Sequence, residues 1–139
     1  MMKKILYVFL LFAIVACENP VIEKVESKYP NGEKNRVAYY QEKDGKEILV
    51  EEKHYHENGV LKMAGKFLNE KREGHWKAYF NNEQLQSIGE FKDGLRIGIV
   101  KVFYPGGQLR YEGQYENDKQ VGHWKFYNER GELVKEEDF

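Results

Sequence analysis

The chain has 139 residues but only one cysteine, Cys17, and three prolines. A single cysteine excludes an intramolecular disulfide. The apolar run at residues 5–15 is shorter than the roughly 20 residues that a membrane-spanning helix needs. The net charge of −1 does not supply the concentrated positive surface that nucleic acid binding requires. We therefore expect neither a disulfide scaffold, nor a membrane-spanning bundle, nor a nucleic-acid-binding protein.

The groups that usually carry enzyme chemistry are also scarce. Ser87 is the only serine after Ser27, so the common hydrolase nucleophile is missing. No glycines form the G-x-G-x-x-G or P-loop pattern that cradles phosphates before a helix. Carboxylates are many, but none stands alone in the apolar surroundings that would raise its pKa. We expect no catalytic residues and no cofactor.

The four histidines are the candidate metal ligands of the chain. His54 and His56 form an H-x-H pair, but only glutamates stand near them as a third ligand, so solvated strand residues are the favoured interpretation. His75 and His123 each precede a tryptophan at equivalent positions. If they lie on strands four apart, about 19 Å separates them, and they cannot share a site. The sequence therefore predicts no metal site.

The N-terminus has the pattern of a secretory signal. Lys3 and Lys4 precede the apolar run 5–15, and the small residue Ala16 comes before Cys17. The string IVAC at 14–17 resembles the lipobox of bacterial lipoproteins. The resemblance implies that residues 1–16 are removed and that Cys17 is lipidated, which anchors the chain to a bacterial membrane in the cell envelope, outside the cytoplasm. The alternative is an incidental thiol at the end of an ordinary signal peptide.

A repeat of 24 residues runs through the rest of the chain. Aromatic residues, leucines and glycines recur in separate columns with this spacing: Tyr55, Tyr79, Phe103 and Tyr127; Leu61, Leu85, Leu109 and Leu133; Phe67, Phe91, Tyr115 and Phe139; Gly74, Gly98 and Gly122. A period of this size is typical of arrays in which each unit packs on its neighbours.

Each repeat contains two segments in which apolar and polar residues alternate, as expected of strands with one buried face. Turn-forming Gly and Asn residues separate the segments. The pattern predicts an all-β fold: an elongated, single-layer antiparallel meander of stacked β-hairpins with about nine strands. Gly65, Gly89 and Gly113 recur inside strands, where glycine is costly. We expect them to leave room for Trp76, Val100 and Trp124.

The predicted domain boundaries follow the 24-residue repeat. Residues 17–28 are interpreted as a tether, with a short strand at 21–25 left open. Residues 29–139 form the repeat domain, divided into a degenerate copy at 29–54, full copies at 55–78, 79–102 and 103–126, and a half copy at 127–139. The copies differ in places: Glu83 and Glu137 stand where glycine is expected, and Val100 stands where tryptophan is expected.

The pattern Y-x-x-x-G-x-L-x-x-x-G-x-[FY], a turn, and then G-x-W-x-x-[YF] resembles the bacterial variant of the MORN repeat. The resemblance is strong over residues 55–139 and weak over 29–54. It implies a non-enzymatic module that binds or scaffolds another protein. Similar proteins are described as antitoxins, so an antitoxin or immunity-type role that neutralises a toxin is the alternative. Lipid headgroup binding, proposed for some MORN proteins, is weaker here because of the net negative charge.

A single-layer sheet has little interior, so part of its aromatic surface must remain open to a partner. The repeat pattern places several aromatic side chains on one face, and these form the candidate protein-binding face: Phe67, Trp76, Tyr111, Tyr115, Trp124 and Phe126.

Overall fold

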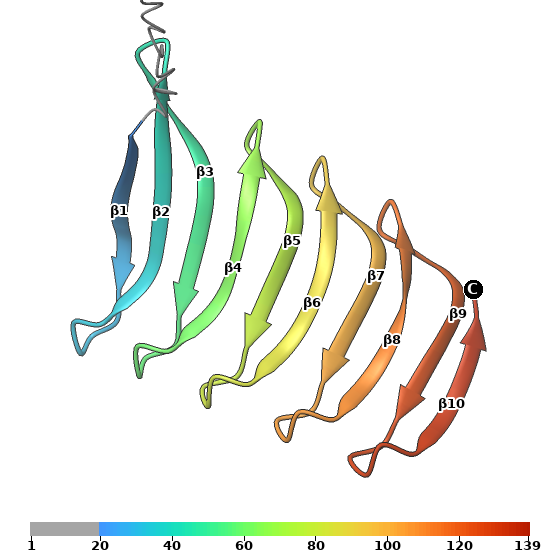
Figure 1. The fold of residues 1–139 in the computed structure, drawn as a ribbon. Helices are drawn as coiled ribbons and strands as arrows, with labels where there is room; N and C mark the ends of the chain where they lie inside the picture. The colour runs from blue at the N-terminus through green and yellow to red at the C-terminus, as the bar shows by residue number, and fades with distance from the viewer. Residues whose placement is uncertain (1–19) are drawn as a thin grey trace, which may run out of the picture.

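The computed structural model describes residues 20–139 and shows one open antiparallel sheet (Figure 1). The predicted signal peptide and Cys17 lie outside the described residues. Ten strands follow one another in chain order across the sheet, which confirms the all-β meander. The strands are β1 Val21–Lys28, β2 Lys34–Lys43, β3 Lys46–Tyr55, β4 Leu61–Leu68, β5 Lys71–Tyr79, β6 Leu85–Lys92, β7 Leu95–Phe103, β8 Leu109–Glu116, β9 Lys119–Tyr127 and β10 Leu133–Asp138.

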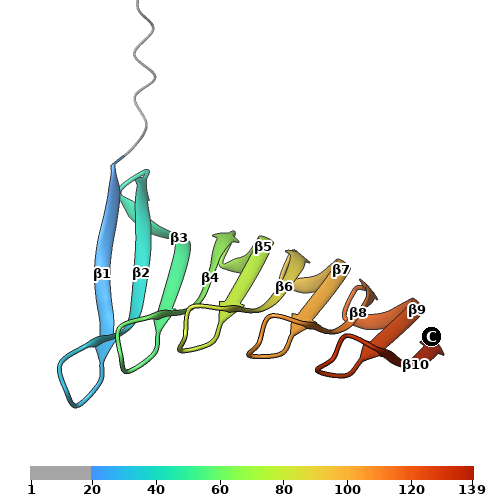
Figure 2. The same cartoon turned by 60° about the horizontal axis from the view of Figure 1, so that its bottom comes forward.

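The sheet is a long, twisted ribbon without a second layer among residues 20–139, as the rotated view makes plain (Figure 2). Few side chains are shielded from water. The buried apolar residues of the described part are Val37, Ala38, Trp76 and Trp124. The core is therefore confined to the surface of the sheet. No helix in residues 20–139 has the length and apolar character needed to cross a membrane.

The sheet has one strand more than the predicted nine, because β1 occupies most of the predicted tether at 17–28. Val21 pairs with Gln41, and Val25 pairs with Val37, so β1 is a full partner of β2. Exposure alternates along its first half, where Ile22 and Lys24 are half-buried and Val21, Glu23 and Val25 are exposed, as expected of a strand. The strand therefore starts where the short strand at 21–25 was expected and continues past it to Lys28.

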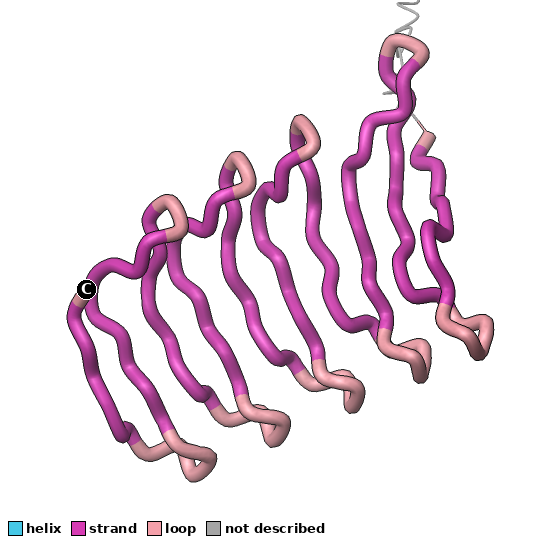
Figure 3. The backbone as a smooth tube through the Cα atoms, turned by 180° about the vertical axis from the view of Figure 1, so that it is seen from behind, coloured by secondary structure: helices cyan, strands magenta, loops and turns pink. Residues whose placement is uncertain are grey.

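The two long edges of the ribbon carry different turns (Figure 3). At one edge, two-residue turns close the hairpins with both residues at positive φ. Asp93 and Gly94, for example, have φ of 51° and 84°. Positive φ at both positions is typical of the type I′ turn, whose twist matches that of the flanking strands. These turns explain why Asn, Asp and Gly recur there.

The opposite edge carries the loops that join successive hairpins. In each loop the first backbone N–H donates to a carbonyl four residues later, as His56 does to Val60 at 2.8 Å. Side chains also link one loop to the next strand end. The Tyr29 hydroxyl donates to the Tyr55 carbonyl at 2.8 Å, and the Tyr104 hydroxyl donates to the Tyr127 carbonyl at 3.0 Å. These bonds align neighbouring hairpins along this edge.

Candidate binding face

The strand register places the six predicted aromatic residues on one side of the sheet, here called the aromatic face. Tyr111 pairs with Phe126 across β8 and β9, and residues that pair directly point to the same face. Residues next to them in sequence, such as Gln114 and Lys125, point to the opposite face. The aromatic face therefore extends along the strands from β4 to β9.

The two tryptophans lie directly on glycine backbone, as predicted. A Cβ atom built on Gly65 would stand 2.2 Å from Cδ2 of Trp76. The corresponding distance from Gly113 to Trp124 is 2.1 Å. In the middle copy, the contact from Gly89 is with the smaller Val100 at 3.7 Å. The absent side chains thus let the indoles lie flat against the sheet.

Around each tryptophan, smaller rings form a cluster. Phe67 and Phe91 contact Trp76 edge-on, with ring centroids 5.4 and 6.0 Å away. Tyr115 meets Trp124 edge-on at 5.3 Å. Such pairs add roughly 0.5–1.5 kcal/mol beyond the area they bury. The remaining rings at Trp124 belong to Tyr111, Phe126 and Phe139.

The predicted residues divide by exposure into two groups. Trp76 and Trp124 are only 4% and 1% exposed, so they form the floor of the face. Phe67, Tyr111, Tyr115 and Phe126 are half-buried and form its accessible surface. The structure thus brings all six onto one face, but only the last four can be touched by a partner.

Two arginines on this face were missed by sequence reasoning. The guanidinium of Arg72 lies 4.2 Å from the centroid of Trp76 and 5.4 Å from that of Phe91. Arg96, one repeat later, lies 4.2 Å from the centroid of Tyr115. Cations stack favourably on ring faces at these distances. Their 24-residue spacing is visible in the sequence and could have identified them as a further column.

At the N-terminal end of the face, a charged cluster replaces the tryptophan. Glu52 stands 24 residues before Trp76 and pairs with Gly65, as Trp76 pairs with Gly89. It is 7% exposed. Arg36 Nε donates to its carboxylate at 3.0 Å, and His54 Nε2 lies 3.2 Å from it.

The electrostatics of this cluster follow from opposing effects. Burial raises the pKa of Glu52, but the hydrogen bonds from Arg36 and His54 outweigh it and hold the pKa below its ordinary value. Glu52 is therefore a paired carboxylate that belongs to the core of this end of the sheet. The 24-residue column was the signal that could have revealed it.

The other histidines do not join this cluster. His56 Nε2 donates to the Tyr79 carbonyl at 2.9 Å, away from the His54–Glu52 contact. His75 and His123 are exposed on the opposite face, and His123 contacts Asp138 at 2.7 Å. Within residues 20–139, no three His, Cys, Asp or Glu side chains form a cluster that could hold a metal ion.

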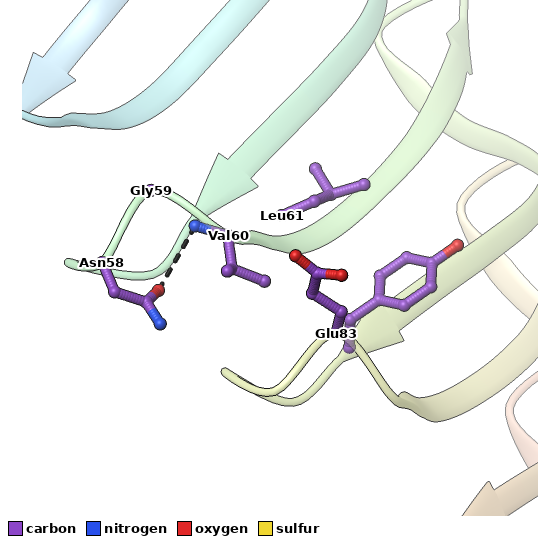
Figure 4. Close-up of a pocket in the computed structure, with 6 residues that line it drawn as sticks. Asn58, Gly59, Val60, Leu61 and Glu83 are labelled. Carbon is purple, nitrogen blue, oxygen red and sulfur yellow. Dashed lines mark hydrogen bonds between the residues drawn. The ribbon is translucent and has the colours of Figure 1, made fainter.

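A shallow hollow lies between two of the connecting loops (Figure 4). It is open to solvent, and its lining combines the carboxylate of Glu83 with the ring of Tyr79 and the aliphatic Val60 and Leu61. The lining offers no nucleophile beside a base, which acyl or phosphoryl transfer would need. The hollow is a seam between repeats.

Comparison with known proteins agrees with this geometry. The MORN repeat variant matches four stretches of the chain: residues 50–69, 72–93, 96–117 and 120–139. Each stretch runs from one strand through a connecting loop into the next strand, and together they cover more than half of the chain. No curated protein matches the chain. Such repeats are commonly protein- or membrane-binding modules. The chain belongs to the MORN repeat variant family.

Proposed function

We propose that this protein is a non-enzymatic bacterial lipoprotein that binds a protein partner through the aromatic face. One observation carries the proposal. Four half-buried rings lie on a sheet face that no second layer covers among residues 20–139. Accessible aromatic surface of this kind marks interaction sites, because aromatic side chains dominate the energetics of protein interfaces.

The anchor is the second part of the proposal. Cys17 carries acyl chains and holds the protein in the cell envelope, with the sheet outside the cytoplasm. The support is the sequence pattern at 14–17 and the short apolar run before it. Two acyl signals are needed for stable anchoring, since one chain binds a membrane only reversibly. Replacing Cys17 with Ala should release the protein from the membrane fraction, and retention there would disprove the anchor.

Photocrosslinking in intact cells tests the binding face. A photoreactive residue at Tyr115 should capture a partner protein, because Tyr115 is on the aromatic face. The matched control is Gln114, the adjacent residue, which points to the opposite face. Equal capture from both positions, or capture only from Gln114, would disprove the assignment of the face.

The same experiment separates the scaffold from the antitoxin or immunity-type alternative. A scaffold should recover components of the cell wall or of secretion. A neutraliser should recover one protein that is toxic to cells lacking this chain and harmless to cells that express it.

A further inference from the structure

Arg72 and Arg96 occupy equivalent positions of the repeat and share the same backbone contact. Each guanidinium stacks on an aromatic ring at 4.2 Å. In each site, the tip turn of the following hairpin donates a backbone N–H to the arginine's own carbonyl: Gly94 to Arg72 at 2.9 Å, and Asp118 to Arg96 at 3.0 Å. The turn residue therefore stands in the same place relative to each arginine.

The two sites differ in their rings, since Arg72 lies on Trp76 and Phe91 and Arg96 lies on Tyr115. They also differ in the turn residue, which decides whether the arginine has an internal partner. The Asp118 carboxylate accepts a hydrogen bond from Arg96 Nε at 2.7 Å and another from the Arg96 backbone N–H at 3.1 Å. Gly94 offers no side chain at the equivalent place. No acidic side chain within residues 20–139 forms an ion pair with Arg72. Arg72 is thus held in position by its rings while its donor groups remain available.

We propose that Arg72 binds a carboxylate of an acidic segment in a partner protein, at the place that Asp118 fills one repeat later. The planar guanidinium fork matches a carboxylate. Its stacking on Trp76 and Phe91 fixes the fork in advance, so less conformational entropy is lost on binding. The inference deepens the proposed function, on which it rests, by naming the chemistry of the partner.

The surroundings favour an acidic peptide over a lipid surface. The half-buried rings of Phe67 and Phe91 flank the site and suit apolar side chains on either side of the acid. Anionic membranes attract clusters of basic residues. Here the arginine next along the face is already neutralised by Asp118, and the chain has a net charge of −1.

The repeat supplies its own blocking variant. Gly94→Asp would place a carboxylate beside Arg72 as Asp118 does beside Arg96. The backbone permits it, because Gly94 has φ of 84° and Asp118 itself has φ of 67°. Space permits it too, since the nearest atom to an added Cβ is Cβ of Lys71 at 3.6 Å. Gly94→Asn is the matched control, with nearly the same shape and no charge.

The probe is a labelled five-residue peptide with one aspartate between two phenylalanines, titrated against the full-length chain in a mild detergent at low salt. Fluorescence anisotropy measures its affinity, and NMR follows the Arg72 Nε–H and the Trp76 indole N–H. We expect both signals to shift and Gly94→Asp to weaken binding by about tenfold. Gly94→Asn should leave the affinity unchanged. Binding that is the same for Gly94→Asp, or for a peptide with asparagine in place of aspartate, would overturn the proposal.

A gain-of-site variant gives an independent readout. Asp118→Asn removes the internal acid at Arg96, so the Arg96 Nε–H should now also shift when the acidic peptide is added. No shift at either arginine would overturn the inference, as would binding of Arg72 to phosphatidylserine vesicles in preference to the peptide. Partner capture from Tyr115 that persists in Gly94→Asp cells would leave the proposed function intact while the carboxylate site fails.

Discussion

The indole of Trp76 occupies the space that a side chain on Gly65 would need, with only 2.2 Å between Cδ2 and the position of a Cβ atom. Real Cβ atoms do not approach other atoms so closely. The ring therefore contacts the backbone of the adjacent strand directly. Glycine and tryptophan at these two positions act as one packing unit, and a change in either is felt by the other.

We predict that Gly65→Ala destabilises the protein by about 2–3 kcal/mol, because the added methyl group displaces the buried indole. Urea unfolding measures the loss. Gly89→Ala is the matched control, since the neighbouring Val100 lies at an ordinary 3.7 Å, and it should cost less than about 1 kcal/mol. Equal losses for the two variants would contradict this packing relationship.

Replacing Glu83 with glycine should stabilise the protein. It has φ of 69°, whereas the equivalent positions in the other loops are glycines, such as Gly131 with φ of 79°. In a residue with a Cβ atom, this positive-φ conformation is destabilised by about 1–2 kcal/mol. Allowing for the greater freedom of glycine in the unfolded chain, Glu83→Gly should stabilise by about 0.5–1 kcal/mol in thermal unfolding.

The reverse change serves as its control. A Cβ atom on Gly131 would meet no atom within 4 Å. Gly131→Ala should therefore destabilise through backbone conformation alone, by about 1 kcal/mol. Unchanged stability in both variants would show that the loops accommodate either residue at these positions, which would contradict this prediction.

Phe80 lacks a hydroxyl where the next loop has one. Tyr104 donates to the Tyr127 carbonyl at 3.0 Å, and His56 makes the corresponding bond to Tyr79 at 2.9 Å. Phe80→Tyr should add this bond to the Phe103 carbonyl and stabilise by about 0.5–1 kcal/mol. Amide hydrogen exchange at the ends of β5 and β7 should slow. Tyr104→Phe should destabilise the protein by a similar amount. Unchanged stability in both variants would contradict the role of these bonds.

Breaking the pair of Arg36 and Glu52 should unfold the N-terminal strands more easily. Arg36→Met leaves the buried Glu52 carboxylate with only His54 as a partner. Because the Arg36 side chain is 43% exposed, we expect the free energy of unfolding to fall by about 2 kcal/mol, less than for a fully buried pair. Combining Arg36→Met with Glu52→Leu should restore most of this stability. A double variant that is worse than the single one would contradict this prediction.

The pairing of β9 with β10 should depend on pH through His123. The hydrogen bond to Asp138 and, second, the hydrogen bond to Glu136 raise the pKa of His123 above its ordinary value of 6.5. A raised pKa adds stability that is fully present below the unfolded pKa and is lost as pH rises through the folded pKa. Hydrogen exchange in β10 should therefore be slower at pH 5.5 than at pH 8.5, after correction for intrinsic rates. Asp138→Asn should remove most of the difference, and a pH-independent ratio would refute it.

The fold could be predicted because the 24-residue columns fix which residues pair and which face they share. The same columns gave the contact of Gly65 with Trp76. They did not predict β1, whose charged residues resemble a tether and whose stability comes from pairing with β2. Arg72 escaped notice because stacking of a cation on a ring requires the three-dimensional positions of both groups. Glu52 was missed because a carboxylate in a tryptophan column becomes interpretable only beside Arg36.

The strictly sequential strand order has a consequence for evolution and engineering. Strands pair only with their neighbours in the chain, and residues 79–102 form one complete unit of the register. Duplicating that unit in tandem should lengthen the ribbon by about 9.6 Å, the width of two strands. The hairpins on either side would keep their own partner strands. The length of the sheet can therefore change without redesign of the other repeats.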